Sequence, residues 1–386
     1  MFNIKTIDNI NENGLSVFSE KYIINGCQTE DAILVRSSNL HDYEMPDTLK
    51  AIARAGAGVN NIPIDVCSQK GIVVFNTPGA NANAVKELVI AGLLVSSRDV
   101  LGGVGWLKSL SCEDNVPQLV EKNKSRFAGS EIKGKTLGVI GLGAIGALVA
   151  NAAEALEMDV LGYDPFISVD AAWKLNKAVD KADVLEDVFE KADYISIHIP
   201  LLDNTKNMIN AETISRMKDG VVILNFSRDA LVDDEALAQA LATGKVAKYV
   251  TDFPNNTIMT MKNVIAIPHL GASTPESEIN CAVMAAKQTK DYLEHGIIKN
   301  AVNYPDCDMG YCRAIGRVAI QHRNIPNMIS QISAVFSKDG INIEDMMHRG
   351  KKELAYTILD VEEHLDDRVL SELKKINGVI RARIIK

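Results

Sequence analysis

The sequence feature that most constrains the fold is a glycine-rich turn that begins at Gly141. It reads Gly-Leu-Gly-Ala-Ile-Gly, follows the apolar run TLGVI directly, and opens the helix-forming run ALVANAAEALEM. In such a turn Gly141 allows the tight bend, Gly143 lets backbone N–H groups approach a phosphate, and Gly146 lets helix and strand pack closely. The helix N-terminus adds unpaired N–H donors and a partial positive charge. The turn, with Ala144 and Ile145, therefore predicts a site for the pyrophosphate of a dinucleotide.

The strand after this turn indicates which dinucleotide is bound. The run VLGYD ends in Asp164, where a carboxylate can accept hydrogen bonds from both hydroxyl groups of the adenosine ribose. The same carboxylate would repel a 2′-phosphate, so the pattern favours NAD over NADP. An alternative interpretation is that Asp164 only forms a turn with Pro165. The glycine turn upstream favours the cofactor role.

The apolar runs around the turn predict an α/β fold. Further short runs follow, separated by segments with helical periodicity: YISIHIP, VVILNFS, YVTDF and VIAIPH. This alternation is typical of a doubly wound parallel sheet of the Rossmann type, covered by helices on both faces. We place this domain at residues 85–271. The apolar stretch 84–108 has helical spacing and predicts one long helix between domains.

The N-terminal and C-terminal regions each show a further pattern of strands and helices. Near the N-terminus a strand at 33–37, a helix at 46–54 and a strand at 71–79 alternate as βαβ. Further along, the polar, turn-rich stretch 303–312 is typical of a linker. The tail 311–386 then reads strand, helix, strand, strand, helix, strand. That order predicts a ferredoxin-like α+β domain.

Length, charge and cysteine usage narrow the possible partners. A chain of 386 residues predicts two or three domains. The formal net charge of −9, with no run of Lys or Arg, disfavours nucleic acid and anionic membranes. No apolar run approaches about 20 residues and the N-terminus lacks a signal pattern, so we expect a cytoplasmic protein without a membrane span. The cysteines form no C-x-x-C pair, which predicts reduced thiols and no metal site; they are Cys27, Cys67, Cys112, Cys281, Cys307 and Cys312.

Two polar residues at later strand ends are candidates for chemistry. Arg228 follows VVILNFS and could donate N–H groups to a carboxylate and a keto oxygen. His269 ends VIAIPH, and an imidazole can move a proton on and off an alcohol near neutral pH. Both lie at the carboxyl edge of the predicted sheet, where open α/β sheets bind ligands. His198, at the end of another strand, is a rival for the proton-transfer role on spacing alone.

Together these segments resemble the D-isomer-specific 2-hydroxyacid dehydrogenase family over nearly the whole chain. The resemblance is carried by VRSSNL, AIARAGAGVNNIPIDVCSQKGIVVFNTPGANANAVKEL, TLGVIGLGAIG, GYDP, HIPLLDNT, NFSRDALVDDEAL and IPHLGAST. It implies that residues 1–84 and 272–302 form a flavodoxin-like substrate domain beside the NAD domain. The activity it implies is NAD-dependent oxidation of 3-phospho-D-glycerate to 3-phosphohydroxypyruvate, the first step of L-serine biosynthesis.

The resemblance implies roles for the residues at the sheet edge. Arg228 matches the family's substrate-binding arginine and His269 its acid/base histidine. His198 matches a loop that lies over the cofactor, and Asp252 matches an aspartate that faces the nicotinamide amide. The further residues assigned to the cofactor in the same segments are Pro200, Ser227 and Gly271.

The resemblance also implies a substrate-binding set in the N-terminal region. The backbone of the loop Ala55-Gly56-Ala57-Gly58 matches the segment whose N–H groups hold the substrate carboxylate. Arg36 and Arg54 match positions that approach the phosphate group of phosphoglycerate, for which guanidinium groups are suitable partners. The alternative for each arginine is a solvated surface side chain.

The chain departs from the family pattern at two places. The family carries a glutamate a few residues after the Asp252 position, where it pairs with the histidine. The segment that follows Asp252 here, FPNNTIM, has no carboxylate. Asp252 or Glu276 could replace the glutamate, or Asn255 could orient the ring. In addition, Asp229 stands where a glycine usually follows the arginine. We expect slower catalysis or a shifted pH optimum.

The tail resembles an ACT domain, a module that senses small molecules. In regulated members of the family this domain binds serine between two subunits. His322, Asn324 and Asn342 stand at the matching positions and could bind the charged ends of an amino acid, although both asparagines could be turn residues only. Asn327 replaces a usual glycine after Pro326, so the turn could differ. The resemblance implies a homodimer or homotetramer.

Two other functions stay open at this point. One is a glyoxylate or hydroxypyruvate reductase of the same family, without recognition of a phosphate. The other belongs to a different class: a catalytically impaired, NAD-responsive regulatory protein. The missing glutamate motivates that interpretation, and Arg228 and His269 oppose it.

Overall fold

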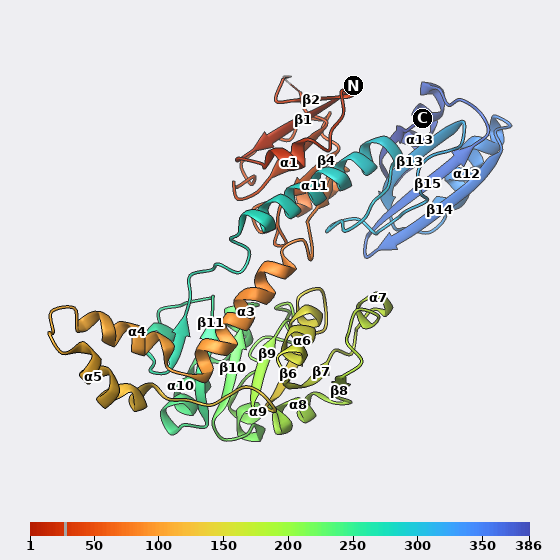
Figure 1. Ribbon diagram of the computed structural model, residues 1–386. Coiled ribbons are helices and arrows are strands. Elements are labelled where there is room, and N and C mark those ends of the chain that lie inside the picture. Colours follow the sequence, from red (N-terminus) through yellow and green to blue (C-terminus); the bar gives the residue numbers. More distant parts are fainter. Residues whose placement is uncertain (27–28) are drawn as a thin grey trace. The chain divides into compact units, whose positions relative to one another are not determined.

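A computed structural model describes residues 1–26 and 29–386 (Figure 1). They form two compact units. The discontinuous unit consists of Met1–Asn81 and Pro275–Lys386, and the continuous unit consists of Ala82–Thr274. Cys27 lies outside the described residues. The other five cysteines are free thiols, as predicted: Cys67, Cys112, Cys281, Cys307 and Cys312.

The continuous unit is built on a seven-stranded sheet with the order β12-β11-β10-β9-β6-β7-β8. The strands are β6 (Thr136–Ile140), β7 (Asp159–Tyr163), β8 (Val179–Lys181), β9 (Tyr194–Ile197), β10 (Val221–Asn225), β11 (Val246–Thr251) and β12 (Val264–Ala266). All of these strands pair in parallel. The chain runs from β6 out to β8 and then returns to β9 on the other side of β6. This reversal is where doubly wound sheets form their ligand crevice.

Helices cover both faces of this sheet, which confirms the doubly wound architecture. On one face α3 (Ala82–Ser97) and α6 (Gly146–Ala155) share a buried apolar cluster with the strands. The other face packs against α8 (Leu185–Lys191), α9 (Ala211–Arg216) and α10 (Asp234–Thr243). The connections also contain α7 (Val169–Ala172) and the 3₁₀ helices η2 (Asp229–Leu231) and η3 (Ile258–Thr260).

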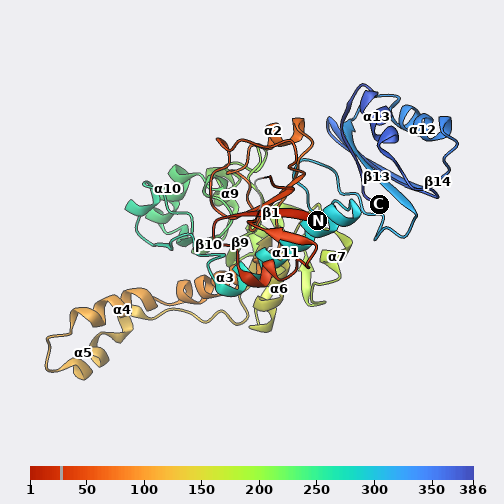
Figure 2. The same ribbon diagram turned by 90° about the horizontal axis from the view of Figure 1, so that it is seen from above.

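The single long helix predicted at 84–108 is wrong, because it is broken into two. α3 ends at Ser97, and α4 (Val100–Ser109) begins after a bend of 69°. The side chain of Asp99 accepts a hydrogen bond from the N–H of Gly102 at 3.1 Å, and this N-cap explains why a new helix starts here. With α5 (Val116–Asn123) and η1 (Lys124–Phe127), α4 forms an arm that extends away from the sheet (Figures 1 and 2).

The discontinuous unit contains a five-stranded sheet with the flavodoxin-like order β2-β1-β3-β4-β5. Its strands are β1 (Phe2–Ile7), β2 (Tyr22–Ile24), β3 (Ala32–Val35), β4 (Ala51–Arg54) and β5 (Val73–Phe75), all paired in parallel. The helix predicted at 46–54 is therefore wrong. Ala51, Ile52 and Ala53 are fully buried between β3 and β5, so packing on both sides overrides the helix propensity of alanine.

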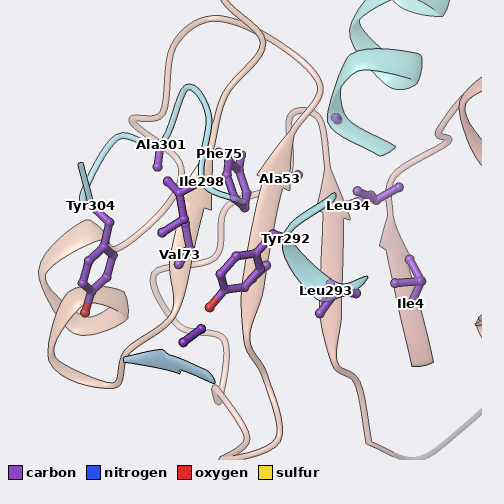
Figure 3. Close-up of a cluster of buried hydrophobic side chains, with 14 of the residues drawn as sticks. Ile4, Leu34, Ala53, Val73, Phe75, Tyr292, Leu293, Ile298, Ala301 and Tyr304 are labelled. Carbon is purple, nitrogen blue, oxygen red and sulfur yellow. The ribbon is translucent and has the colours of Figure 1, made fainter. Parts of the chain in front are cut away.

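Three helices accompany this sheet: α1 (Glu12–Leu15), α2 (Ile64–Gln69) and the long α11 (Pro275–His295). α2 packs on one face through the buried Cys67. On the other face, α11 contributes Tyr292 and Leu293 to an apolar core with β5. Figure 3 shows Val73 and Phe75 of β5 beside Tyr292, and the Phe75 and Tyr292 rings meet edge to face at 5.7 Å between centroids.

The C-terminal segment has the predicted βαββαβ order. It contains β13 (Gly316–Arg323), α12 (Met328–Lys338), β14 (Ile343–Lys351), β15 (Leu354–Val361), α13 (Asp367–Lys375) and β16 (Val379–Ile384). The antiparallel sheet has the order β14-β15-β13-β16, which is the ferredoxin-like topology. Both helices cover the same face of this sheet (Figure 2).

The other face of the C-terminal sheet packs onto the five-stranded part of the same unit. Ala319, Tyr356 and Ile358 share one buried cluster with residues of β1, β3, β4, β5 and α11. The stretch 303–312, predicted to be a linker, belongs to this packing. Tyr304 and Cys307 are buried, and Cys307 pairs with Ile298 through its backbone. The C-terminal segment is thus an integral part of the discontinuous unit.

Candidate active site

The glycine-rich turn lies at the carboxyl end of β6, beside the reversal of the sheet. Gly141 has φ 90°, and a Cβ at this position would lie 2.6 Å from the carbonyl oxygen of His198. A Cβ at Gly146 would lie 1.8 Å from the carbonyl oxygen of Gly141, so helix and turn are too close for any side chain. Nothing lies within 4 Å of the Cβ position at Gly143. A glycine is therefore suited to each of these three positions for a different physical reason.

The same turn presents unpaired donors at the N-terminus of α6. Among the described residues, no group accepts a hydrogen bond from the N–H of Gly143, Ala144 or Ile145. Three neighbouring N–H groups, open space above Gly143 and the helix dipole fit a dinucleotide pyrophosphate. These residues could hold the phosphates through backbone contacts alone.

Asp164 follows β7, the strand next to β6. Its Oδ2 accepts a hydrogen bond from the N–H of Leu142 at 2.9 Å, and its Oδ1 accepts one from the N–H of Phe166 at 2.8 Å. The carboxylate therefore forms its own turn and also fixes the glycine-rich turn. Each carboxylate oxygen retains a second lone pair for a ribose hydroxyl. The turn-forming role is observed, and binding of the ribose stays a prediction.

His198 follows β9, which lies on the opposite side of β6 from the strand that leads to Asp164. Its Nε2 lies 2.8 Å from the hydroxyl of Ser196, while its buried Nδ1 has no hydrogen-bond partner among the described residues. Burial lowers the pKa of His198 to about 4, so the ring is neutral at neutral pH. An imidazole with a pKa this far below neutral is a weak base at neutral pH. This observation favours the cofactor-side role for His198 over its role as a rival to His269. Pro200, two residues on, is exposed, and its carbonyl accepts a hydrogen bond from the Thr205 hydroxyl.

Three adjacent strand ends carry the remaining candidates. β10 leads to Ser227 and Arg228, and β12 leads to His269; β11 lies between them and leads to Asp252. Arg228 and His269 are both exposed. Sequence reasoning did not single out Asn225, which is buried at the end of β10 and whose Nδ2 donates to the carbonyl of Arg228 at 2.8 Å. The sequence does offer a signal for Asn225, because this amide ends the otherwise apolar run VVILN.

The departure at Asp229 does not disturb this edge. Asp229 begins η2 and is not among the residues with positive φ, so no glycine is required there. The hydroxyl of Ser227 donates to the carbonyl of Ile197 at 2.7 Å, which ties the Arg228 segment to β9.

Asp252 is the carboxylate that lies closest in sequence to the missing glutamate. It is buried, its Oδ2 accepts the N–H of Gly271 at 3.2 Å, and its Oδ1 has no partner among the described residues. Burial raises the pKa of Asp252, and the nearby charges of His269 and Arg228 oppose that rise. Asn255 does not serve as a replacement, because its Oδ1 accepts the N–H groups of two residues in the following turn and its Nδ2 donates to Asp234.

The segment after Asp252 places an aromatic ring among these side chains. The Phe253 ring centroid lies 4.5 Å from that of His269, with an interplanar angle of 50°. The guanidinium carbon of Arg228 lies 5.6 Å from the same Phe253 centroid. Phe253 is half-buried, and its N–H donates to the hydroxyl of Thr251 at 3.1 Å. Sequence reasoning missed this residue, because nothing in a single Phe indicates its neighbours.

In the discontinuous unit, the loop after β4 has the character of an anion-binding segment. The N–H groups of Ala57 and Gly58 have no acceptor among the described residues. Arg54 lies beneath this loop: its Nε donates to the carbonyl of Arg36 at 2.9 Å, and its guanidinium also donates to the carbonyl of Gly58. A Cβ at Gly56 would come within 3.3 Å of that guanidinium. Arg54 therefore fixes the loop in addition to any contact with a ligand.

Arg36 follows β3 and is already paired. Its guanidinium donates to Glu278 at 2.6 Å, and both side chains are 40% exposed. The backbone around Arg36 is fixed by Asp8, whose Oδ2 accepts the N–H groups of Arg36 at 2.9 Å and Ser38 at 3.0 Å. Burial opposes ionisation of Asp8, but hydrogen bonds from Ser38 and the backbone lower its pKa to about 2. Asp8 is thus an anion that orders the segment carrying Arg36.

A cavity of about 920 Å³ lies at the opposite, amino edge of the seven-stranded sheet. Its lining includes Lys135, Asp193 and Gly220, which precede β6, β9 and β10. Open α/β sheets bind ligands at the carboxyl ends of their strands, so we assign no part of the site to this cavity.

Two of the predicted effector residues, His322 and Asn324, lie at one end of the C-terminal sheet, whereas Asn342 precedes β14 at the opposite end. His322 is buried, with Nδ1 2.8 Å from the carbonyl of Arg323 and Nε2 2.9 Å from the hydroxyl of Thr357. Both ring nitrogens are therefore occupied within the domain. Asn324 is exposed and donates to the carbonyl of Lys352 at 3.0 Å, and Asn342 is exposed. Asn327 occupies the N-cap position of α12 with φ 69°, a left-handed conformation that glycine and asparagine adopt more readily than other residues.

Comparison with known proteins decides the family. The family model described as "D-isomer specific 2-hydroxyacid dehydrogenase, NAD binding domain" matches residues 106–271. The D-3-phosphoglycerate dehydrogenase of Haemophilus influenzae is 31% identical over 345 residues, which cover 85% of this chain and 79% of that protein. The chain belongs to the D-isomer specific 2-hydroxyacid dehydrogenases. Its continuous unit carries the family's NAD-binding domain.

Two further comparisons describe the extent of the similarity. The D-3-phosphoglycerate dehydrogenase of Methanocaldococcus jannaschii is 34% identical over 313 residues, 78% of this chain, but the chain spans only 57% of that relative's length. A crystal structure of NAD⁺-bound 3-phosphoglycerate dehydrogenase from Entamoeba histolytica aligns with a TM-score of 0.59 and 29% identity. It covers 78% of this chain and 98% of that one.

The described part of the chain contains neither a cluster of metal-binding side chains nor a single helix that could span a membrane. No group of three or more His, Cys, Asp or Glu side chains there could hold a metal ion. No single helix is long and apolar enough to cross a membrane, although the bent pair α3 and α4 reaches that length and composition when taken together.

Proposed function

We propose that the protein oxidises 3-phospho-D-glycerate to 3-phosphohydroxypyruvate with NAD, in the direction of L-serine synthesis. The observation that carries the proposal is the set of unpaired groups at the carboxyl edge of one sheet. The N–H groups of Gly143, Ala144 and Ile145 fit the cofactor, and the exposed side chains of Arg228 and His269 follow strands on either side of β11. The relatives named D-3-phosphoglycerate dehydrogenase support the choice of substrate.

The proposed reaction removes a hydride from C2 of the substrate and a proton from its hydroxyl group. When bound, the nicotinamide supplies the acceptor for the hydride. His269 accepts the hydroxyl proton as the C2–O bond becomes a carbonyl. Arg228 donates hydrogen bonds to the substrate carboxylate and to the oxygen that bears negative charge during the transfer. The N–H groups of Ala57 and Gly58 are the proposed backbone donors for the carboxylate.

The decisive experiment follows NADH absorbance with purified protein, NAD and phosphoglycerate, and in reverse with phosphohydroxypyruvate and NADH. We expect turnover in both directions and a fall in kcat/KM of at least about 100-fold in Arg228→Ala, because a charged hydrogen-bond donor to the transition state is lost. NADH affinity should stay nearly unchanged, since Arg228 is assigned to the substrate. The proposal is wrong if the wild-type protein binds NADH but turns over neither substrate.

A reductase of hydroxypyruvate or glyoxylate is the second candidate, and one structural observation favours it. Both arginines proposed for the phosphate already have partners: Arg36 pairs with Glu278, and Arg54 binds the loop carbonyls. Equal kcat/KM for hydroxypyruvate and its phosphorylated form would support this candidate. A clear preference for the phosphorylated form supports phosphoglycerate oxidation. A protein that binds NADH and acts on neither compound would instead be a regulatory member of the family.

We further propose that the protein forms a homo-oligomer and that its C-terminal domain binds an amino acid such as serine. Support for self-association comes from the arm, whose three helices contain no buried residue and expose Leu101 and Val104 by 53% and 47%. Helices of 8 and 10 residues are marginal without a packing partner, and we assign that role to a second copy. Light scattering measures the oligomeric state. A titration of the activity with serine measures whether the amino acid acts on the enzyme.

A further inference from the structure

The order of the sheet places the segment after β11 between the two proposed catalytic side chains. β11 lies between β10, which leads to Arg228, and β12, which leads to His269. Neighbouring strands are about 4.8 Å apart, so the backbones of the two outer strands are separated by roughly 10 Å. The side chain that fills this interval is Phe253, which contacts the His269 ring at 4.5 Å and the Arg228 guanidinium at 5.6 Å, measured to its ring centroid.

Few other contacts restrain the two outer side chains. The guanidinium of Arg228 donates to the carbonyl of the preceding residue, Ser227, at 2.6 Å. Within the described residues the His269 ring makes no hydrogen bond, and its ring contact is with Phe253. The segment offers no carboxylate after Asp252 to orient that ring. Phe253 is the aromatic neighbour that both proposed catalytic groups share.

Phe253 is well suited to this task because it is itself fixed. Its N–H donates to Thr251, and the preceding residue Asp252 is buried and accepts the N–H of Gly271. A phenyl side chain has only two rotatable bonds, its face attracts a guanidinium, and it packs against an imidazole. One ring can thus hold a cation and an imidazole at a set spacing.

We propose that Phe253 is a positioning residue, which holds Arg228 and His269 in the orientation that the reaction requires. This inference rests on the proposed dehydrogenase function. In the segment after Asp252, which has no carboxylate, the uncharged ring of Phe253 orients the catalytic groups. Loss of the ring leaves both catalytic groups present but free to rotate, so the chemical step suffers while cofactor binding does not.

The kinetic test compares Phe253→Leu, Phe253→Tyr and a control. We expect Phe253→Leu to lower kcat by about 10- to 100-fold, with KM changed less than kcat, because misorientation acts on the transition state. The NADH dissociation constant and Tm should stay close to the wild-type values. Phe253→Tyr keeps the ring and should recover most of the lost rate. Phe18→Leu is the matched control, since this partly buried Phe makes a similar ring contact, with Tyr22, in the other unit.

A spectroscopic readout separates positioning from a general structural effect. In the wild-type protein the ring current of Phe253 should shift the Cε1 proton resonance of His269, which the variant His269→Asn identifies by its absence. Phe253→Leu should return that resonance to an ordinary position, and Phe18→Leu should leave it unchanged. The inference is overturned if the shift is absent in the wild type, or if Phe253→Leu retains full kcat.

The choice of substrate separates a failure of the role of Phe253 from a failure of the proposed function. The kinetic comparison uses whichever of phosphoglycerate and hydroxypyruvate the wild-type protein turns over. Activity with hydroxypyruvate alone would contradict the proposed substrate and still decide the role of Phe253. Without activity on either compound the proposed function fails, and with it a role for Phe253 in that reaction.

Discussion

At the scale of single residues, the ion pair between Arg36 and Glu278 affects whether Arg36 can bind a substrate phosphate. The pair with Glu278 is half exposed on both sides, and such pairs contribute only about 0–1 kcal/mol. A doubly charged phosphate can therefore displace the carboxylate at small cost. Glu278 is a competitor for Arg36, and the competition can be measured.

We expect Glu278→Gln to lower the KM for phosphoglycerate by roughly two- to fivefold, because Arg36 no longer has an anionic partner to release. The KM for hydroxypyruvate should not change, since it has no phosphate. Steady-state kinetics with both substrates measure this difference. Glu372→Gln, which removes a comparable exposed pair with Lys375, is the control. A KM that falls for both substrates alike would contradict phosphate binding by Arg36.

These residues also show which parts of the site could be predicted. The turn that begins at Gly141 and the carboxylate Asp164 are separated by one helix and one strand, α6 and β7, so local spacing reveals them. Glu278 is 242 positions away from Arg36, and no local pattern connects them. Phe253 was missed for the same reason, since its two neighbours belong to different strand ends. Sequence identified the residue types needed for chemistry, whereas their partners depend on the tertiary structure.

At the scale of elements, the apolar periodicity predicted the sheets well and the helix limits poorly. The central strands β6, β9 and β10 are mostly apolar and buried, as is typical of parallel strands covered on both faces. The stretch 84–108 kept helical spacing through a bend of 69°, because periodicity does not register a capping residue such as Asp99. β4 was mistaken for a helix because two of its four residues are alanine.

The turn between β6 and α6 yields a paired prediction. Gly146→Ala should lower Tm by several degrees, because its Cβ would lie 1.8 Å from the Gly141 carbonyl oxygen. Gly143→Ala has open space and should leave Tm nearly unchanged, but it should weaken NADH binding because the methyl group occupies the phosphate approach. Thermal unfolding and NADH fluorescence titration measure the two effects. Equal loss of Tm in both variants would show that the turn has a packing role only.

The whole discontinuous unit depends on its C-terminal domain. Buried polar contacts join the two parts: Gln321 donates to the carbonyl of Gly71 and to the hydroxyl of Tyr292, and the Arg383 guanidinium lies 4.1 Å from the Tyr292 ring centroid. Beside them, Arg317 forms a two-point ion pair with Asp360 at 2.5 and 2.7 Å. Sequence predicted the ferredoxin-like fold of this domain. It could not predict which face of its sheet would be covered.

A chain ending at residue 310 should therefore fail to form a stable discontinuous unit, because removal of the C-terminal sheet exposes Tyr292 and the apolar cluster around it. We expect increased binding of a hydrophobic dye and loss of substrate turnover. NADH binding should persist, because its residues belong to the continuous unit. Dye fluorescence, activity and NADH titration of the shortened chain check this. Wild-type turnover by residues 1–310 would show that the domain is a removable appendage.

The contacts that join these parts have one further property. Lys351 donates to the carbonyls of Ala301 and Val302, Arg381 to that of Leu49, and Tyr356 to that of Gly296. The acceptor in each of these four bonds belongs to the main chain, which is present whatever amino acid occupies the position, unlike the Tyr292 hydroxyl that accepts from Gln321. A change of side chain at these four accepting positions therefore leaves the bonds in place, whereas loss of a donor side chain removes its bond.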